Sequence, residues 1–135
     1  MKKAVLFLLL ALIFSSCYDV TGPDQEKSLY GSWRLQKISG GLQGTTTEIS
    51  PDKAPKVLFT YGGTVIFYSS DNKLARSTTF TLTEGKTIYS TDEKSIIHFA
   101  DNLDNPMVIF SISEDTLVLA DNDYDGFSYI YLKER

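Results

Sequence analysis

The chain has 135 residues, of which 42% are hydrophobic, 22% charged and 13% aromatic, the composition of one globular domain. Its 17 acidic and 13 basic residues give a net charge of −4, so we exclude a nucleic-acid-binding protein, which needs a basic face. One Cys and one His exclude an intrachain disulfide and a Cys/His zinc site, and we expect no cofactor.

Residues 1–16 have the three-part pattern of a secretory signal peptide. Lys2 and Lys3 form a positive start, residues 4–14 are an apolar run, and the small residues Ser15 and Ser16 follow. As a helix the apolar run would rise only about 16 Å, roughly half the thickness of the hydrocarbon core. We therefore interpret residues 1–16 as a signal peptide and not as a membrane span.

The only Cys of the chain, Cys17, follows directly after this segment. The sequence Phe-Ser-Ser-Cys at 14–17 resembles the lipobox of bacterial lipoproteins, with Phe14 where that family usually has Leu. The resemblance implies palmitate-type acyl chains on Cys17 and a membrane as partner. It also implies a cell-envelope location, which we expect to be the outer membrane, on either its periplasmic or its surface side. The alternative is an ordinary secretory signal followed by an unpaired thiol, which is uncommon in an exported protein.

The segment that follows is polar, and the apolar patterning starts only after it. Residues 17–28 contain Gly22, Pro23 and several charges, so we interpret them as the lipidated Cys and a flexible tether. Residues 29–135 then form one domain, because so short a span holds a single hydrophobic core.

Within this domain, short runs of β-branched and aromatic residues recur between turn residues, and no helical period is visible. The pattern predicts an all-β fold: an antiparallel up-and-down barrel or nearly closed sandwich of about eight strands. Gly62 and Gly63 predict a two-residue hairpin turn. The expected strands are 30–38, 56–61, 64–69, 76–83, 87–90, 94–100, 107–112, 116–120 and 127–133, the fifth and sixth being one broken strand or two.

Alternation within these strands predicts the core face only in part. The other face also carries large residues, namely Ile66, Tyr68, Tyr129 and Tyr131, which predicts strong curvature, a covered outer face or a lined cavity. Residues 39–55 are expected to form a long loop, a candidate lid over one end. The predicted core residues are Val65, Phe67, Ile97, Phe99, Val108, Phe110, Ile112, Leu117, Leu119, Ile130 and Leu132.

The start of the domain carries a recognisable motif. Gly31-Ser32-Trp33 resembles the Gly-x-Trp opening of lipocalin-like families, in which Trp closes the barrel floor. The resemblance to small bacterial lipocalin-like lipoproteins implies that a basic side chain, Arg135 or failing that Lys133, stacks on Trp33. This chain is shorter than full lipocalins, so a large ligand cavity is not implied. The alternative is that Trp33 is a core aromatic residue without family meaning.

Two further features were weighed as sites of chemistry. Asp121, Asp123 and Asp125 with Gly126 match the first half of a calcium loop, but Leu132 stands where the bidentate Glu is needed, so a solvated turn is favoured and no metal site is predicted. The same interpretation applies to residues 101–105. His98 is interpreted as a barrel-wall residue, and because no nucleophile motif is present we expect no enzymatic activity.

Two functions from different classes are compatible with the sequence. One is binding of a small hydrophobic or amphipathic ligand in the barrel, by residues that the sequence does not identify. The other is a packed interaction module or inhibitor that contacts another envelope or secreted protein through loops or through Tyr68, Tyr129 and Tyr131. An apolar cavity of roughly 300 Å³ or more would favour the first.

Overall fold

A computed structural model describes residues 28–135 of this protein. The predicted signal peptide, the lipobox with Cys17 and nearly all of the predicted tether lie outside the described residues. Within the described residues, no helix has both the length and the apolar character needed to cross a membrane.

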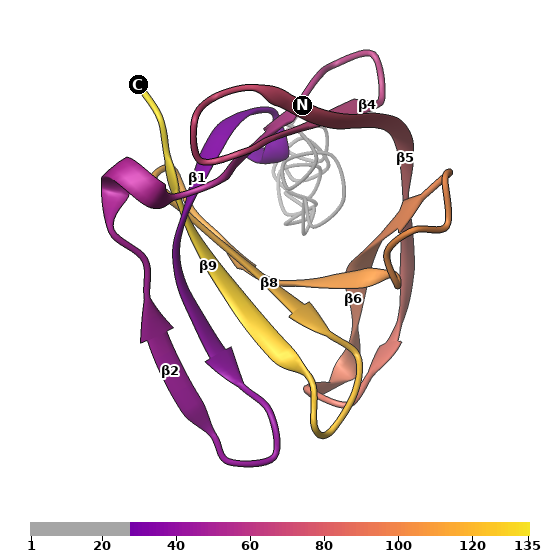
Figure 1. Cartoon of the computed structure of the whole chain (residues 1–135). Helices are drawn as coiled ribbons and strands as arrows, with labels where there is room; N and C mark the ends of the chain where they lie inside the picture. The colour runs from indigo at the N-terminus through magenta and orange to yellow at the C-terminus, as the bar shows by residue number, and fades with distance from the viewer. Residues whose placement is uncertain (1–27) are drawn as a thin grey trace, which may run out of the picture.

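Nine antiparallel strands form one sheet in the order β2-β1-β3-β4-β5-β6-β7-β8-β9, and β9 also pairs with β1 (Figure 1). The sheet therefore closes into an eight-stranded barrel of β1 and β3 to β9, with β2 as an extra strand. This confirms the predicted all-β barrel and is consistent with a lipocalin-like fold. The strands are β1 Gly31–Gly40, β2 Thr45–Glu48, β3 Lys56–Phe59, β4 Thr64–Tyr68, β5 Leu74–Thr87, β6 Ser90–Phe99, β7 Met107–Ile112, β8 Thr116–Asp121 and β9 Phe127–Lys133.

The β3–β4 hairpin turns through three residues, so the predicted two-residue turn is wrong. The Gly63 N–H donates to the Thr60 carbonyl (3.1 Å), and Gly63 has φ of +76°. A turn followed by a left-handed residue is the usual three-residue hairpin, and glycine adopts that conformation without a Cβ clash. Asn72 (φ +60°) has the same place in the β4–β5 turn, where its N–H donates to the Ser69 carbonyl.

The segment 39–55 is not a lid, which corrects our expectation. Its residues 45–48 form β2, which pairs with the distal half of β1 as a hairpin extending from the barrel (Figure 1, lower left). All four residues of β2 are exposed. A short 3-10 turn, Pro51–Lys53, then leads into β3. The expected strand 87–90 is likewise corrected, because these residues are mainly the turn between the long strands β5 and β6.

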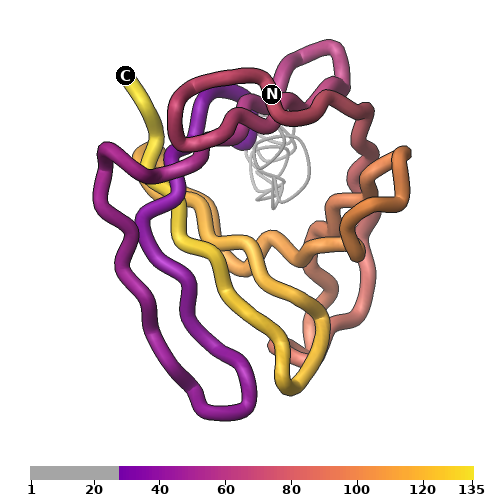
Figure 2. Tube along the Cα trace, in the orientation of Figure 1, coloured from indigo at the N-terminus to yellow at the C-terminus, as the bar shows by residue number. Residues whose placement is uncertain are grey.

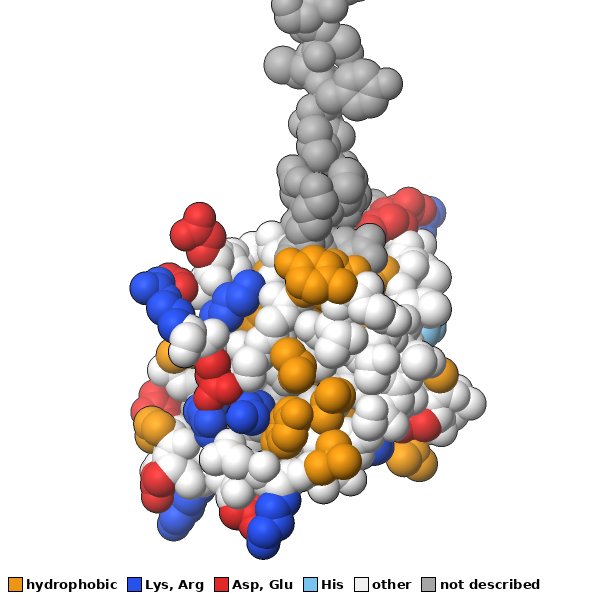
Figure 3. All heavy atoms as spheres, turned by 90° about the horizontal axis from the view of Figure 1, so that it is seen from above, with side chains coloured by type: hydrophobic (Ala, Val, Ile, Leu, Met, Phe, Trp, Pro, Cys, Tyr) orange, Lys and Arg blue, Asp and Glu red, His pale blue; other side chains and the backbone are white. Residues whose placement is uncertain are grey.

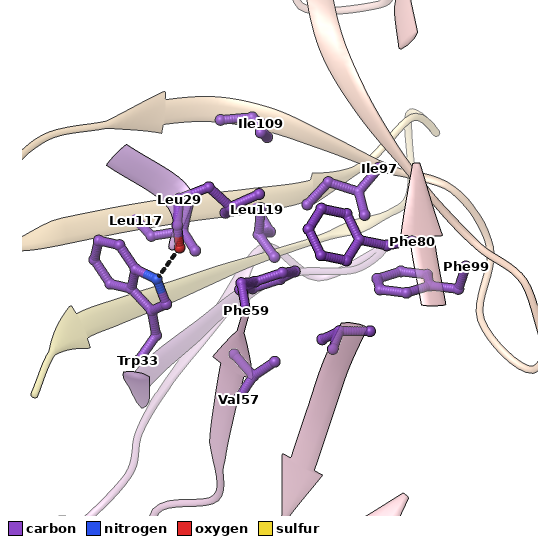
Figure 4. Packing of buried hydrophobic residues seen from close by; sticks show 11 residues of the cluster. Leu29, Trp33, Val57, Phe59, Phe80, Ile97, Phe99, Ile109, Leu117 and Leu119 are labelled. Carbon is purple, nitrogen blue, oxygen red and sulfur yellow. Dashed lines mark hydrogen bonds between the residues drawn. The ribbon is translucent and has the colours of Figure 1, made fainter. Parts of the chain in front are cut away.

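The core lies inside the barrel, and Figure 4 shows its buried side chains packed together, Trp33 among them. Trp33 is fully buried and its indole Nε1–H donates to the Leu29 carbonyl at 2.7 Å. Phe59 and Phe80 pack edge to face with ring centroids 5.2 Å apart. These aromatic residues come from β1, β3 and β5, so the core also joins strands such as β3 and β5 that do not pair directly. The cluster comprises Leu29, Trp33, Val57, Phe59, Val65, Phe80, Ile97, Phe99, Ile109, Leu117 and Leu119.

Phe110, one of the predicted core residues, points out of the barrel. A bulge between Ile109 and Ser111 shifts the register of β7 on β8, which places Ile109 inside and leaves Phe110 45% exposed. Phe110 contacts Tyr89 instead, with ring centroids 5.4 Å apart.

The predicted faces of β9 are reversed. Leu132, expected inside, is 41% exposed. Ile130, two residues earlier, lies on the same face of the strand as Leu132. Tyr129 and Tyr131, expected on the outer face, point inward and line a cavity. Both faces of this strand carry large side chains with apolar surface, so the alternation of residue types does not show which face is buried.

Part of the outer wall is covered by the chain itself. Val108 and Ala120 are neighbours on the outer face of β7 and β8, and both are fully buried. The turn of the β5–β6 hairpin reaches them: the Tyr89 hydroxyl donates to the Asp121 carbonyl, and the Ile88 N–H donates to Asn122 Oδ1 at 3.0 Å. The hairpin therefore bends over the barrel wall and buries a second small apolar layer.

The pairing between β6 and β7 is short. β6 and β7 are joined in register at only two residue pairs, Ile96 with Val108 and Ile97 with Met107. β5 and β6 share seven such pairs. The β6–β7 seam is therefore the shortest ladder of the closed barrel.

Candidate functional site

A partly open cavity of about 370 Å³ lies in the barrel beyond the packed core. Its inner part is formed by buried core residues and its rim by the β6–β7 loop and the end of β8. A second hollow of about 300 Å³ adjoins it and shares Val57, Phe67 and Tyr131 with it. The cavity of about 370 Å³, called the central cavity below, is lined by Val57, Phe59, Phe67, Phe99, Leu103, Asp104, Asn105, Met107, Leu119, Asp121, Tyr129 and Tyr131.

Two tyrosines of β9 give the central cavity its polar wall groups. Their side chains share one face of the strand because they are two residues apart. Burial raises the pKa of Tyr131 far above its usual range, with smaller contributions from Tyr129 and Asp104. Neither hydroxyl makes a hydrogen bond to another group within residues 28–135. These hydroxyls are therefore available to a molecule in the cavity.

Two carboxylates stand at the rim of the central cavity. Asp104 comes from the β6–β7 loop and Asp121 from the end of β8. Burial, followed by the negative charges of Asp121 and Asp104, raises the pKa of Tyr129. The carboxylates thus act on the cavity wall electrostatically, and within the described part of the chain no Lys, Arg or His lines the cavity.

Arg76 of β5 fixes the β6–β7 loop at this rim. Its guanidinium stacks on the Phe67 ring (4.1 Å to the centroid) and pairs with Asp101 (3.5 Å) and Asp104. Phe67 in turn lies 5.9 Å from the Phe99 ring, centroid to centroid. One cation therefore links the aromatic wall to the loop that borders the opening.

At the opposite end, Lys133 and not Arg135 lies over Trp33. The Lys133 Nζ is 4.8 Å from the centre of the Trp33 ring, because Lys133 is paired with Trp33 across β9 and β1. Arg135 lies beyond the strand and pairs with Asp115 at 2.9 Å. The expectation for Arg135 is therefore wrong, and its stated substitute, Lys133, has the contact. Gly31, the other residue of the motif, has φ of +126°, and a Cβ there would lie 3.0 Å from Lys133 Cε.

A carboxylate next to this end joins the segment after β9 to β1, and Figure 2 shows the trace of β9 running beside that of β1. Glu134 accepts hydrogen bonds from Ser32 Oγ and from Arg34 Nε, each at 2.7 Å, and lies 3.7 Å from Lys56 Nζ. The Ser32 hydroxyl and then Arg34 and Lys56 lower the pKa of Glu134, against a smaller opposing effect of burial. The Glu134 N–H also donates to the Ser32 carbonyl. The chain end is thus fixed on the first strand of the barrel.

Residues 121–126, the candidate calcium loop, form the turn between β8 and β9. Asp121 Oδ2 accepts the Phe127 N–H at 2.9 Å, and the Gly126 N–H donates to the Asp123 carbonyl at 3.0 Å. Within residues 28–135, no group of three or more His, Cys, Asp or Glu side chains is placed to hold a metal ion. Neither Asp125 nor the loop 101–105 therefore belongs to such a group among the described residues. His98 lies on the barrel wall, where its Nε2 is 2.8 Å from the Thr83 hydroxyl.

The sequence drew attention to Asp121 and to residues 101–105 only as candidate calcium turns and did not connect them with Arg76. Arg76, Asp104 and Asp121 became a group only through the fold, because they come from β5, a loop and β8. The tyrosines were noted, but on the wrong face. No spacing rule connects residues that meet across a barrel mouth.

No family model, no curated protein and no solved structure matches the chain.

Proposed function

We propose that this chain is a lipid-anchored cell-envelope protein whose lipocalin-like barrel binds one small hydrophobic or amphipathic molecule. The observation that carries the proposal is the partly open central cavity of about 370 Å³ with aromatic walls. A barrel of eight strands is about the size at which side chains alone can fill the interior. This one leaves a partly open cavity beside its packed core.

The size and chemistry of the cavity support a small ligand. Its volume is near the lower end of the roughly 300 to 1,000 Å³ typical of ligand pockets. Phe59, Phe67 and Phe99 offer apolar contact, while the free hydroxyls of Tyr129 and Tyr131 offer directed hydrogen bonds. A molecule with a short chain or ring system and one polar end suits this wall.

The anchor is proposed from the sequence alone. Acyl chains on Cys17 would contribute about 0.8 kcal/mol per buried CH₂, so two or more chains hold a protein in a bilayer stably. Removal of residues 1–16 also removes Lys2 and Lys3, which makes the remaining chain more acidic. Such a chain is repelled by anionic headgroups, so the domain stands away from the membrane, in the periplasm or at the surface.

The alternative, a packed interaction module, has less support. Two of the three tyrosines on which it depended, Tyr129 and Tyr131, face the cavity, and the third, Tyr68, lies beneath Lys56 Nζ (4.8 Å to the ring centroid). On the face seen in Figure 3, apolar side chains form small groups among polar atoms, with charges of both signs beside them. Exposed aromatic residues such as Tyr124 are scattered, which is ordinary for a surface.

Native mass spectrometry of the full-length protein purified from its own host tests the proposal. We expect a stoichiometric adduct of small-molecule mass that is lost on organic extraction. Tyr124→Phe, an exposed residue outside the cavity, is the control and should keep the adduct. A bare domain that co-purifies with one envelope protein would overturn the proposal and establish the interaction module.

A further inference from the structure

We propose that the central cavity selects an amphipathic ligand that carries a positively charged amine. The apolar part of the ligand would lie among the aromatic walls, and its ammonium group near Asp121. This inference rests on the proposed function, because it names the class of molecule that the same cavity takes.

The first argument is the sign of the charge at the cavity. Among residues 28–135, the lining contains two carboxylates and no basic side chain. Asp104 is already matched by Arg76. Asp121 forms no ion pair within the described residues, and its one side-chain hydrogen bond is to the backbone N–H of Phe127. Asp121 is therefore the unmatched charge that faces the cavity.

The nearby cations do not reverse this sign. Arg76 lies between Asp101 and Asp104, so two carboxylates face one guanidinium. Lys56 lines the adjoining hollow, where its Nζ lies 3.7 Å from Glu134 and over the Tyr68 ring. Each cation is thus matched by an acidic partner, and the charge of Asp121 is left over.

The second argument is the aromatic wall. The faces of Tyr and Phe rings attract ammonium groups, more strongly where water is excluded. Phe67 already binds one cation in this way, since the Arg76 guanidinium lies over its ring, 4.1 Å from the centroid. Tyr129 and Tyr131 line the same cavity as the rim carboxylates, and burial, followed by the charges of Asp121 and Asp104, raises the pKa of Tyr129.

The third argument is discrimination. A fatty-acid-like ligand would bring its carboxylate toward Asp121, and the lining contributed by residues 28–135 has no Lys or Arg to pair with it. An unmatched buried charge of like sign is costly, so the cavity rejects an anionic head. A neutral head would gain the tyrosine hydrogen bonds but not the charge interaction.

Three probes with one chain length separate these effects: octylamine, octanol and octanoate. The full chain in phosphatidylcholine nanodiscs is titrated with each probe by calorimetry, and empty nanodiscs give the heat of partition into lipid. We expect octylamine to bind about tenfold or more tightly than octanol, and octanoate to bind weakest, as expected for one close charge interaction in a partly desolvated site.

Asp121→Asn is the test variant, because the amide oxygen keeps the hydrogen bond from Phe127 while the charge is removed. We expect it to remove most of the preference for octylamine over octanol. Asp92→Asn, an exposed carboxylate on β6 outside the cavity, makes the same change in net charge and should leave the preference intact.

The outcomes separate the two levels of the proposal. Equal binding of octylamine and octanol overturns the amine inference and leaves cavity binding in place. Unchanged octylamine binding in Asp121→Asn overturns the assignment of the ammonium site. If no octyl probe binds, the central cavity is not a ligand site and the proposed function itself fails.

Discussion

Replacing Trp33 by Ala tests whether the Gly-x-Trp motif fixes the closed end of the barrel. Trp33 is fully buried, donates a 2.7 Å hydrogen bond to the Leu29 carbonyl and carries Lys133 over its ring. Loss of a buried Trp side chain costs about 3 to 5 kcal/mol, including the cavity that is left. The unpaired Leu29 carbonyl adds about 1 kcal/mol, so we expect a total near 5 kcal/mol. That is much of the roughly 5 to 15 kcal/mol that holds a domain folded.

Equilibrium urea unfolding of the full chain, followed by far-ultraviolet circular dichroism, measures this loss. Two milder variants divide it into parts. Trp33→Phe keeps an aromatic ring without the N–H and should cost about 1 to 3 kcal/mol, and Lys133→Met removes the cation and should cost about 1 kcal/mol or less. Tyr124→Ala, at an 88% exposed position, should change stability by less than about 0.5 kcal/mol. A loss below about 1 kcal/mol in Trp33→Ala would refute the reasoning, because the ring would then be peripheral.

Three further predictions follow from the site, the chain end and the sequence. Met107→Trp adds bulk to the cavity wall, so the affinity for octylamine should fall at least about tenfold in calorimetry. The free energy of unfolding should change by less than about 3 kcal/mol. An unchanged affinity would mean that ligands bind elsewhere. The pKa of Glu134 is lowered on folding, so its contribution is present above its ordinary value of 4.5 and lost as pH falls through the lower folded value. Glu134→Gln should therefore cost about 1 kcal/mol at neutral pH and nothing in acid, in urea unfolding across that range; a cost that persists in acid contradicts this. Cys17→Ala should release the protein from membranes and abolish labelled palmitate incorporation, and equal labelling of variant and parent would disprove lipidation.

The sequence was sufficient for the fold class because turn residues and β-branched runs recur at regular spacing. The failures lie where local geometry departs from simple alternation. The bulge after Ile109 turns Phe110 outward, and a bulge depends on the partner strand as much as on its own residues. Strand β2 was missed because its Thr-rich segment is fully exposed and has no apolar face, so only its β-branched residues offered a signal.

The site was harder to predict than the fold for a different reason. The sequence identified Tyr129 and Tyr131 as unusual but could not choose their face, because Ile130 and Leu132 are equally suited to a core. The rim residues carry no motif, since Arg76 and Asp104 meet only after the barrel closes. Closure is a long-range property, and no local pattern encodes it.

The short seam between β6 and β7 has a consequence for the local stability of the barrel wall. Strands held by two residue pairs separate more readily than strands held by seven, so amide hydrogens of β7 near Val108 should exchange with solvent faster than those of β5 near Leu82. Met107, at this seam, also lines the cavity. A bound molecule that contacts Met107 would therefore slow hydrogen exchange along the seam, because it stabilises the closed wall.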